Sequence, residues 1–163
     1  PRDIVDHFLT RSDGEMLEAL EDVDPETLKI RERIRSAVKA RIELHGGRKD
    51  AVGRTLAYLA LPMNAALSAR ALWRTSDVIW RWAGDRATDY NHYTKRAILS
   101  AVYSSTLLYW LNDDSEDAEK TWGFLDRRIE NVMQFEKLKA KVLCKTEKMP
   151  DIARRLGRLR YGK

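Results

Sequence analysis

Four residues between positions 89 and 96 place a carboxylate, two rings and a cation at helical spacing. Asp89, His92, Tyr93 and Arg96 follow one another at intervals of three, one and three, so on a helix they share one face. Such a face is either solvated or a docking surface, because Tyr and Arg bury apolar area while making directional polar contacts. The pair Asp89 and His92 cannot complete a metal site without further ligands.

The chain offers little for catalysis. Its three histidines, His7, His45 and His92, are far apart, and none belongs to an H-E-x-x-H or paired E-x-x-H pattern. The sequence has no P-loop and no G-x-G-x-x-G, and the single cysteine, Cys144, has no nearby His or Asn to activate it. We therefore expect no enzymatic activity, no bound metal and no catalytic cofactor.

Aromatic residues concentrate between Trp73 and Trp110. They either fill a core or line an apolar cavity between helices, in which small neighbouring residues would leave room for a ligand. The sequence leaves both readings open. In the second, the expected lining residues come from the uncharged helix and its tryptophan-rich neighbour: Trp73, Trp80, Ala97, Ala101, Ser105 and Leu108.

Composition indicates that helices must position these residues. The 163 residues are 44% apolar and 34% charged, which is typical of one soluble globular domain. Eight Gly and four Pro leave few sites for tight turns, so many short strands are unlikely and the predicted fold class is all-α.

Apolar periodicity and capping residues divide the chain into expected helices. Asp24, followed by Pro25, suits the start of the second helix, and Gly84 suits the end of the fourth. Asp114 or Ser115 is expected to cap the last long helix. The predicted helices cover about residues 2–21, 25–45, 48–60, 63–83 and 116–148. One further helix is expected to begin at Asp85 or Thr88 and to include residues 97–111.

Residues 97–111 contain no charged side chain. A helix of this kind is expected at the centre of the fold, covered nearly all round. With fifteen residues it falls short of the roughly 20 that a bilayer requires, so a membrane span is not expected.

Positive charge is concentrated at the carboxyl end. The formal net charge is +5, and the segment from Lys137 to Lys163 is basic almost throughout. We expect a helical domain over residues 1–148 and a short basic amphipathic segment over 149–163. This tail is either a solvated end, a binder of RNA or a binder of anionic membranes, and its apolar spacing favours the membrane. The expected membrane contacts are Ile152, Arg155, Leu156 and Leu159.

The run from Trp80 to Leu99, WRWAGDRATDYNHYTKRAIL, carries a more specific signal. It resembles the ubiquinone (coenzyme Q) biosynthesis lipid-binding accessory proteins through the pattern AGD-x-x-TD-[YF]-N-x-YT-[KR]-R. The resemblance continues through residues 101–103, 113–115 and 122–129, and more loosely upstream, so that it covers about residues 1–140.

The resemblance implies a fold similar to the ligand-binding domain of TetR regulators, forming a homodimer. A helix-turn-helix-like region precedes this domain in the family, and we expect it to be absent from this chain. The family binds an isoprenoid lipid or quinone precursor without catalysis and presents it to a ubiquinone-biosynthesis hydroxylase. We therefore expect a protein of the bacterial cytoplasm or mitochondrial matrix, peripherally associated with the inner membrane.

The family's partner-docking patch corresponds to Asp89, Tyr93 and Arg96, and to His92, where animal members have Trp. The alternative is the ligand-binding domain of a TetR-type transcriptional repressor, which would require a DNA-reading domain upstream. Binding of nucleic acid without sequence preference through the basic tail is a third hypothesis. We expect no specific nucleic acid partner.

Overall fold

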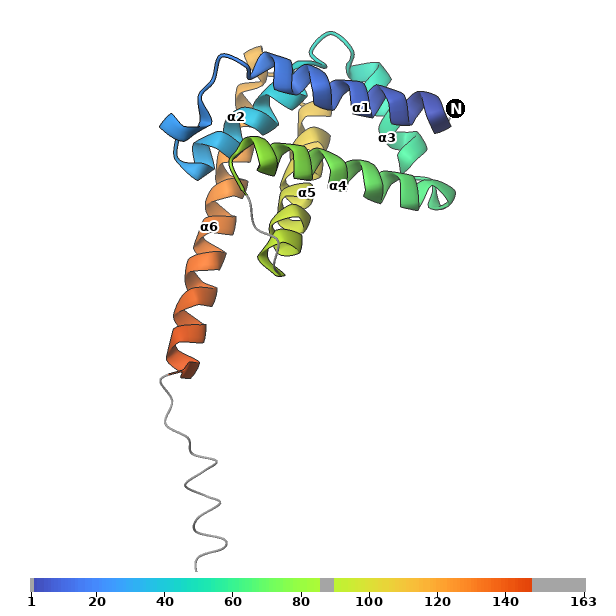
Figure 1. Cartoon of the computed structure of the whole chain (residues 1–163). Helices are drawn as coiled ribbons and strands as arrows, with labels where there is room; N and C mark the ends of the chain where they lie inside the picture. The colour runs from blue at the N-terminus through green and yellow to red at the C-terminus, as the bar shows by residue number, and fades with distance from the viewer. Residues whose placement is uncertain (1, 86–89, 148–163) are drawn as a thin grey trace, which may run out of the picture. The chain divides into compact units, whose positions relative to one another are not determined.

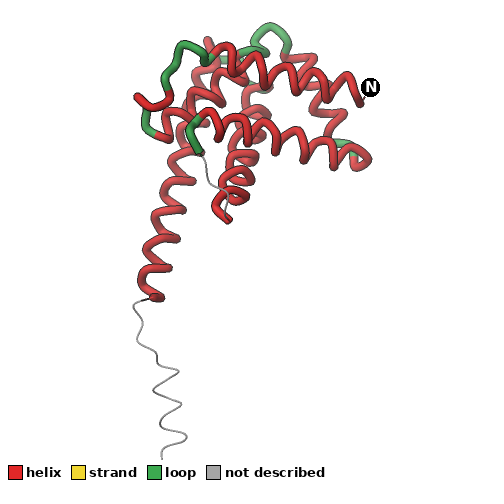
Figure 2. Tube along the Cα trace, viewed as in Figure 1, coloured by secondary structure: helices red, strands yellow, loops and turns green. Residues whose placement is uncertain are grey.

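The computed structural model describes residues 2–85 and 90–147, apart from the side chains of 90, 91 and 136–147. Within these ranges every regular element is a helix, which confirms the all-α prediction (Figures 1 and 2). The helices are α1 (Arg2–Ala19), α2 (Ile30–Glu43), α3 (Lys49–Leu59), α4 (Ala65–Trp82), α5 (Tyr90–Leu111) and α6 (Glu119–Glu147), with single 3-10 turns at Pro25–Thr27, Pro62–Asn64 and Glu116–Ala118.

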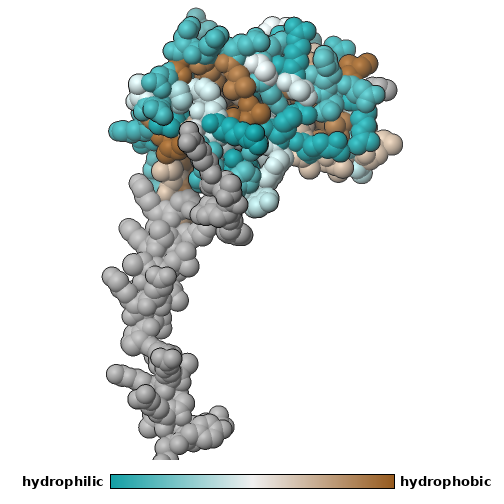
Figure 3. Space-filling model, viewed as in Figure 1, coloured by the Kyte–Doolittle hydropathy of each residue, from teal (hydrophilic) through white to brown (hydrophobic). Residues whose placement is uncertain are grey.

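The chain forms two compact units, Pro1–Ile129 and Glu130–Lys163. In the first, α4 packs against both α1 and α5, and α2 contacts α1, α4 and α5. Apolar side chains at helical spacing form its core. Those with no exposed surface are Met16, Ala37, Val38, Ile42, Ile79 and Leu125. Around this core the face in view in Figure 3 is mostly hydrophilic, with separate small hydrophobic areas.

The second helix begins later than the sequence predicts. Asp24 does act as a cap, since its Oδ1 accepts from the Glu26 amide at 2.9 Å, but the helical turn that it caps ends at Thr27. Extended backbone at Leu28 and Lys29 then separates this turn from α2. The prediction of one continuous helix from Pro25 is therefore wrong, because nothing in the local pattern marks the two extended residues.

Gly84 ends α4 as predicted. Its φ is +87°, and the amides of Gly84 and Asp85 donate to the carbonyls of Arg81 and Trp80 at 3.0 and 2.9 Å. This is the Schellman arrangement, which favours glycine because a side chain is strained at positive φ. A Cβ at this position would also lie 3.1 Å from Nη1 of Arg33.

The uncharged segment within α5 is not covered all round. Leu99, Val102 and Leu107 are buried, whereas Leu108 is 55% exposed and Ala97 and Ala101 are also exposed. Tyr109 is the fourth exposed position of this segment at 38%, so the apolar surface left in water comes mainly from two alanines, Leu108 and this tyrosine. The expectation that this helix is covered nearly all round is therefore wrong on this side.

Two residues cap the start of α6, Asp113 and Ser115, and only Ser115 was predicted. Oδ2 of Asp113 accepts from the backbone amide and the hydroxyl of Thr121 at 2.8 and 2.6 Å. Ser115, which was predicted, accepts from the Lys120 amide at 3.2 Å, whereas Asp114 is exposed. Burial raises the pKa of Asp113, but hydrogen bonds from Ser115 and Thr121 outweigh it and hold that pKa well below its usual range.

A buried polar cluster joins α1, α2 and α4. Oδ1 of Asp13 accepts from Nε of Arg41 at 3.0 Å and from the Thr75 hydroxyl at 2.8 Å, and Oδ2 accepts from Nε of Arg74 at 3.2 Å. Nη1 of Arg41 also lies 2.6 Å from Nε2 of His45. Burial, followed by the charges of Arg41 and Arg48, lowers the pKa of His45 to about 4.

The second unit is described from Glu130 to Glu147 as a continuation of helix α6. Phe135 in this helix is 60% exposed. The predicted amphipathic segment 149–163, with Ile152, Arg155, Leu156 and Leu159, lies outside the described residues. None of the described helices combines the length and the apolar character needed to cross a membrane.

Candidate functional site

The first turns of α5 and the middle of α4 bring three rings together. Trp73 lies 5.8 Å from Tyr93 and 6.3 Å from His92 between ring centroids, and His92 meets Tyr93 edge-on at 5.3 Å. Tyr93 is 62% exposed, and Trp73 and His92 are half-buried. His92 and Tyr93, two of the four residues predicted for docking, therefore share an aromatic surface, and the ring of Trp73 packs against both of them.

Arg96 does not present its guanidinium on that surface. It is 1% exposed; its Nε donates to Oδ1 of Asp77 at 3.0 Å and its Nη1 donates to Oδ2 of Asp85 at 2.7 Å. The expectation that Arg96 forms part of an exposed docking face is therefore wrong in this conformation. Its two carboxylate partners draw it inward, and it links α5 to α4 and to the end of the turn after α4. Asp89 lies outside the described residues.

Asp85 anchors a second cation of the same region. Nζ of Lys95 lies 2.6 Å from its Oδ1 and 5.3 Å from the ring centroid of Trp80. The Trp80 indole N–H in turn donates to the Lys95 carbonyl at 3.1 Å. Burial raises the pKa of Asp85, but the hydrogen bonds from Lys95 and Arg96 outweigh it and keep that pKa below its usual value. The sequence pattern included Asp85 but did not reveal this role, and it missed Asp77.

The predicted ligand-lining residues do not surround an enclosed cavity. Ala97, Ala101 and Leu108 are exposed, Ser105 is half-buried, and its hydroxyl donates to the Val102 carbonyl at 3.0 Å. Trp73 and Trp80 are half-buried on α4. Together with Tyr93, the three exposed residues form one strip along α5, which we call the open α5 face: Tyr93, Ala97, Ala101 and Leu108. Of the two readings left open by the sequence, neither a filled core nor a cavity between helices describes Ala97, Ala101 and Leu108, which lie on an open, largely apolar surface.

Among the described residues, no three His, Cys, Asp or Glu side chains gather closely enough to hold a metal ion. A cavity lies at the opposite end of α5, around Trp110 and Trp122. No pattern in the sequence brought these two tryptophans together, because they belong to different helices.

The arrangement of the helices defines the fold class. The solved structure of a TetR transcriptional regulator from Nitrosomonas europaea is similar, with a TM-score of 0.64 over 78% of this chain and 70% of that one. At 20% sequence identity this similarity shows the fold alone. The predicted TetR-like helical fold is therefore confirmed.

The sequence shows a more specific similarity than the fold does. Residues 65–136 match the COQ9 family model, and this range includes α4, the aromatic cluster and the open α5 face. The chain is 36% identical over 138 residues to the mitochondrial ubiquinone biosynthesis protein COQ9 of Xenopus tropicalis, and 33% identical over 140 residues to that of Homo sapiens. The resemblance inferred from the run Trp80 to Leu99 is confirmed, and the chain is related to the COQ9 family.

These matches cover 80% and 82% of this chain but only 44% of each relative. The chain therefore spans less than half the length of the curated relatives that it matches.

Proposed function

We propose that this chain is a non-catalytic accessory protein of ubiquinone biosynthesis. The observation that carries the proposal is the COQ9 match over residues 65–136, which contains both the aromatic cluster and the open α5 face. The relatives are named as mitochondrial ubiquinone biosynthesis proteins. A role in the same pathway, in the mitochondrial matrix or its bacterial equivalent, follows from that kinship.

In this proposal the chain binds an isoprenoid lipid or quinone precursor along the open α5 face. Ala97 and Ala101 leave a shallow, smooth strip beside Leu108, and an extended prenyl chain would remove that apolar surface from water. Each buried methylene contributes about 0.8 kcal/mol, so a long isoprenoid gains enough from such contact to bind. A second copy of the chain in a homodimer would enclose the lipid on the side that is open here.

The aromatic cluster of Trp73, His92 and Tyr93 is the proposed docking surface for a membrane-associated hydroxylase. Tyr93 offers exposed aromatic area with a polar tip, which is characteristic of interface hot spots. Arg96 acts indirectly in this proposal, because its bonds to Asp77 and Asp85 fix the first turns of α5 against α4. The segment 149–163 would contact the membrane surface.

The test of lipid binding compares two matched variants. Protein purified without detergent is extracted with organic solvent, and the extract is analysed by mass spectrometry. Ala101→Glu places a charge on the open α5 face, and Ala51→Glu places the same charge on an exposed position of α3. An isoprenoid that co-purifies with the wild type and Ala51→Glu but not with folded Ala101→Glu supports the proposal. Lipid-free wild-type protein that binds a defined DNA operator would instead favour a repressor.

The test of docking uses two tyrosines of the same helix. Tyr93→Ala should weaken binding to the hydroxylase by at least about tenfold, the usual scale for a hot-spot residue. Tyr109→Ala, at a position that is 38% exposed and stacked on Phe124, should leave the affinity unchanged. Equal affinities for the two variants would contradict the assignment of the docking surface.

A further inference from the structure

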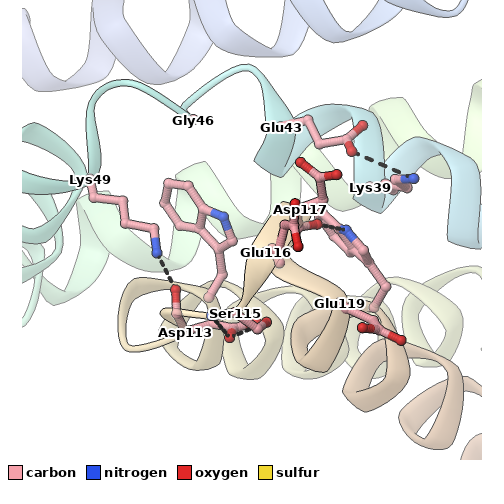
Figure 4. Close-up of a pocket in the computed structure, with 12 residues that line it drawn as sticks. Lys39, Glu43, Gly46, Lys49, Asp113, Ser115, Glu116, Asp117 and Glu119 are labelled. Carbon is pink, nitrogen blue, oxygen red and sulfur yellow. Dashed lines mark hydrogen bonds and ion pairs between the residues drawn. The ribbon is translucent and has the colours of Figure 1, made fainter.

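A cavity of about 810 Å³ lies where α2, the turn after it, the end of α5 and the start of α6 meet. Figure 4 shows Lys39, Glu43, Gly46 and Lys49 along one side and Asp113, Ser115 and Glu119 along the other, with Glu116 and Asp117 between them. Its volume is within the ~300–1,000 Å³ of ligand pockets. All its lining residues belong to the unit Pro1–Ile129.

The two lysines of the cavity are already occupied. Nζ of Lys39 lies 3.5 Å from Oε1 of Glu43 and 5.4 Å from the ring centroid of Trp122. Nζ of Lys49 donates to the Asp113 carbonyl at 2.5 Å and lies 5.1 Å from the ring centroid of Trp110. Each ammonium therefore lies near an indole ring and has an oxygen partner, and neither of them forms an ion pair with Glu116, Asp117 or Glu119.

Three rim carboxylates have no cation. Glu116, Asp117 and Glu119 are exposed and form no ion pair with any residue of the described ranges 2–85 and 92–135. The Asp113 carboxylate is occupied by Ser115 and Thr121. The lining comprises five acidic and two basic side chains, so the cavity carries a formal charge of −3 in a chain whose total is +5. A negative cavity in a positively charged chain attracts cationic groups.

Trp110 provides a hydrogen-bond donor in the wall of the cavity. It is only 3% exposed and lines the cavity, and its indole N–H forms no hydrogen bond in the part of the chain that the structure describes; because this N–H is not among the buried atoms that lack a partner, it faces the open space of the cavity. The indole of Trp122, by contrast, donates to the Asp117 carbonyl at 2.8 Å. A ligand that fills the cavity would displace water from this N–H, so a well-matched ligand should bring an acceptor of its own.

We propose that this cavity binds a basic segment of a partner protein. A Lys or Arg side chain of the partner lies beside Glu116, Asp117 and Glu119, and a backbone carbonyl of the same segment accepts the hydrogen bond of Trp110. A peptide carries both groups a few ångströms apart. A polyamine carries the cations but has no acceptor oxygen, so it can pair with the carboxylates but cannot accept the hydrogen bond of Trp110.

Fluorescence anisotropy with a labelled acetyl-Gly-Arg-Gly-Lys-Gly-amide peptide tests the proposal on the full chain. Glu116→Gln combined with Asp117→Asn should weaken binding about fivefold, the scale of two exposed ion pairs. Asn tolerates the positive φ of 49° at position 117, so the backbone is preserved. The matched control, Glu18→Gln with Glu21→Gln, changes the net charge equally at exposed positions outside the cavity and should bind as the wild type does.

A second comparison tests the acceptor. Trp110→Phe removes the N–H but keeps an aromatic ring, and it should weaken peptide binding about fivefold while leaving spermidine binding unchanged. The urea midpoint of each variant shows whether it remains folded. Equal peptide affinity in the two double variants would overturn the site. Spermidine binding as tight as that of the peptide would overturn the assignment to a protein segment.

Discussion

Nη1 of Arg96 lies 2.7 Å from Oδ2 of Asp85, and the two side chains are 1% and 7% exposed. The same guanidinium reaches Asp77 through Nε at 3.0 Å. One side chain thus holds two carboxylates, one on α4 and one directly after its terminal glycine. A lysine cannot reproduce this contact, because its single ammonium lacks the fork geometry.

Arg96→Lys should therefore lower the free energy of unfolding by about 1–2 kcal/mol. Urea denaturation measures the change. Arg81→Lys is the control, because Arg81 pairs with the same Asp77 but is 73% exposed, and it should shift stability by less than about 0.5 kcal/mol. Similar losses of unfolding free energy in the two variants would show that the burial of Arg96 does not strengthen its ion pairs.

Asp13→Asn should be more damaging. Arg41 has no exposed surface, and its Nε donates to the Asp13 carboxylate at 3.0 Å, so the substitution leaves a buried cation without its charge partner. The expected loss of unfolding free energy is about 3–5 kcal/mol. Thermal and urea unfolding measure it. Asp6→Asn should have a much smaller effect, because Asp6 pairs with Arg74 at a position 39% exposed.

His45 should make stability depend on pH. Its pKa is lowered to about 4 in the folded protein, whereas the unfolded chain titrates near 6.5, so the unfolded state binds more protons between these values. Stability is therefore full above pH 6.5 and falls as the pH approaches 4, by up to about 3 kcal/mol. His45→Gln should remove this slope, and His7→Gln, at an exposed position, should retain it. Urea midpoints measured from pH 7 to pH 4.5 give the pH dependence of stability. An unchanged pH dependence in His45→Gln would contradict the role given to His45.

Asp113→Ala should loosen the start of α6. The carboxylate accepts from the Thr121 amide and from the amide and hydroxyl of Ser115, so its removal leaves several donors unsatisfied. Loss of such a cap costs about 1–2 kcal/mol. Hydrogen exchange at the Thr121 amide should accelerate in this variant and not in Asp114→Ala, which alters the exposed neighbour. Unchanged exchange in Asp113→Ala would contradict the capping role.

Local features of the fold were predictable from the sequence, because helical periodicity and end signals act over a few residues. Gly84 illustrates this, since its positive φ follows from its position after the apolar run of α4. The late start of α2 was missed because extended residues such as Leu28 have no distinctive pattern.

Contacts between distant residues were not predictable. Asp13 and Thr75 are 62 positions apart, and no spacing rule relates them. The docking prediction failed at Arg96 for the same reason: helical spacing placed it on the face of Tyr93, but the partners that bury it, Asp77 and Asp85, come from other segments. The open α5 face was mistaken for a cavity wall because small apolar residues suit both.

The buried cluster around Asp13 also limits how this sequence can diverge. Its carboxylate accepts from a residue of α2 and two of α4, so a substitution at position 13 alone removes a hydrogen bond from Arg41, Arg74 and Thr75 at once, although Arg74 keeps its ion pair with Asp6. An apolar replacement is tolerable only when the arginines change as well. Relatives should therefore either keep the whole set or have exchanged it as a block, which makes these four positions a covariation group that joins three helices.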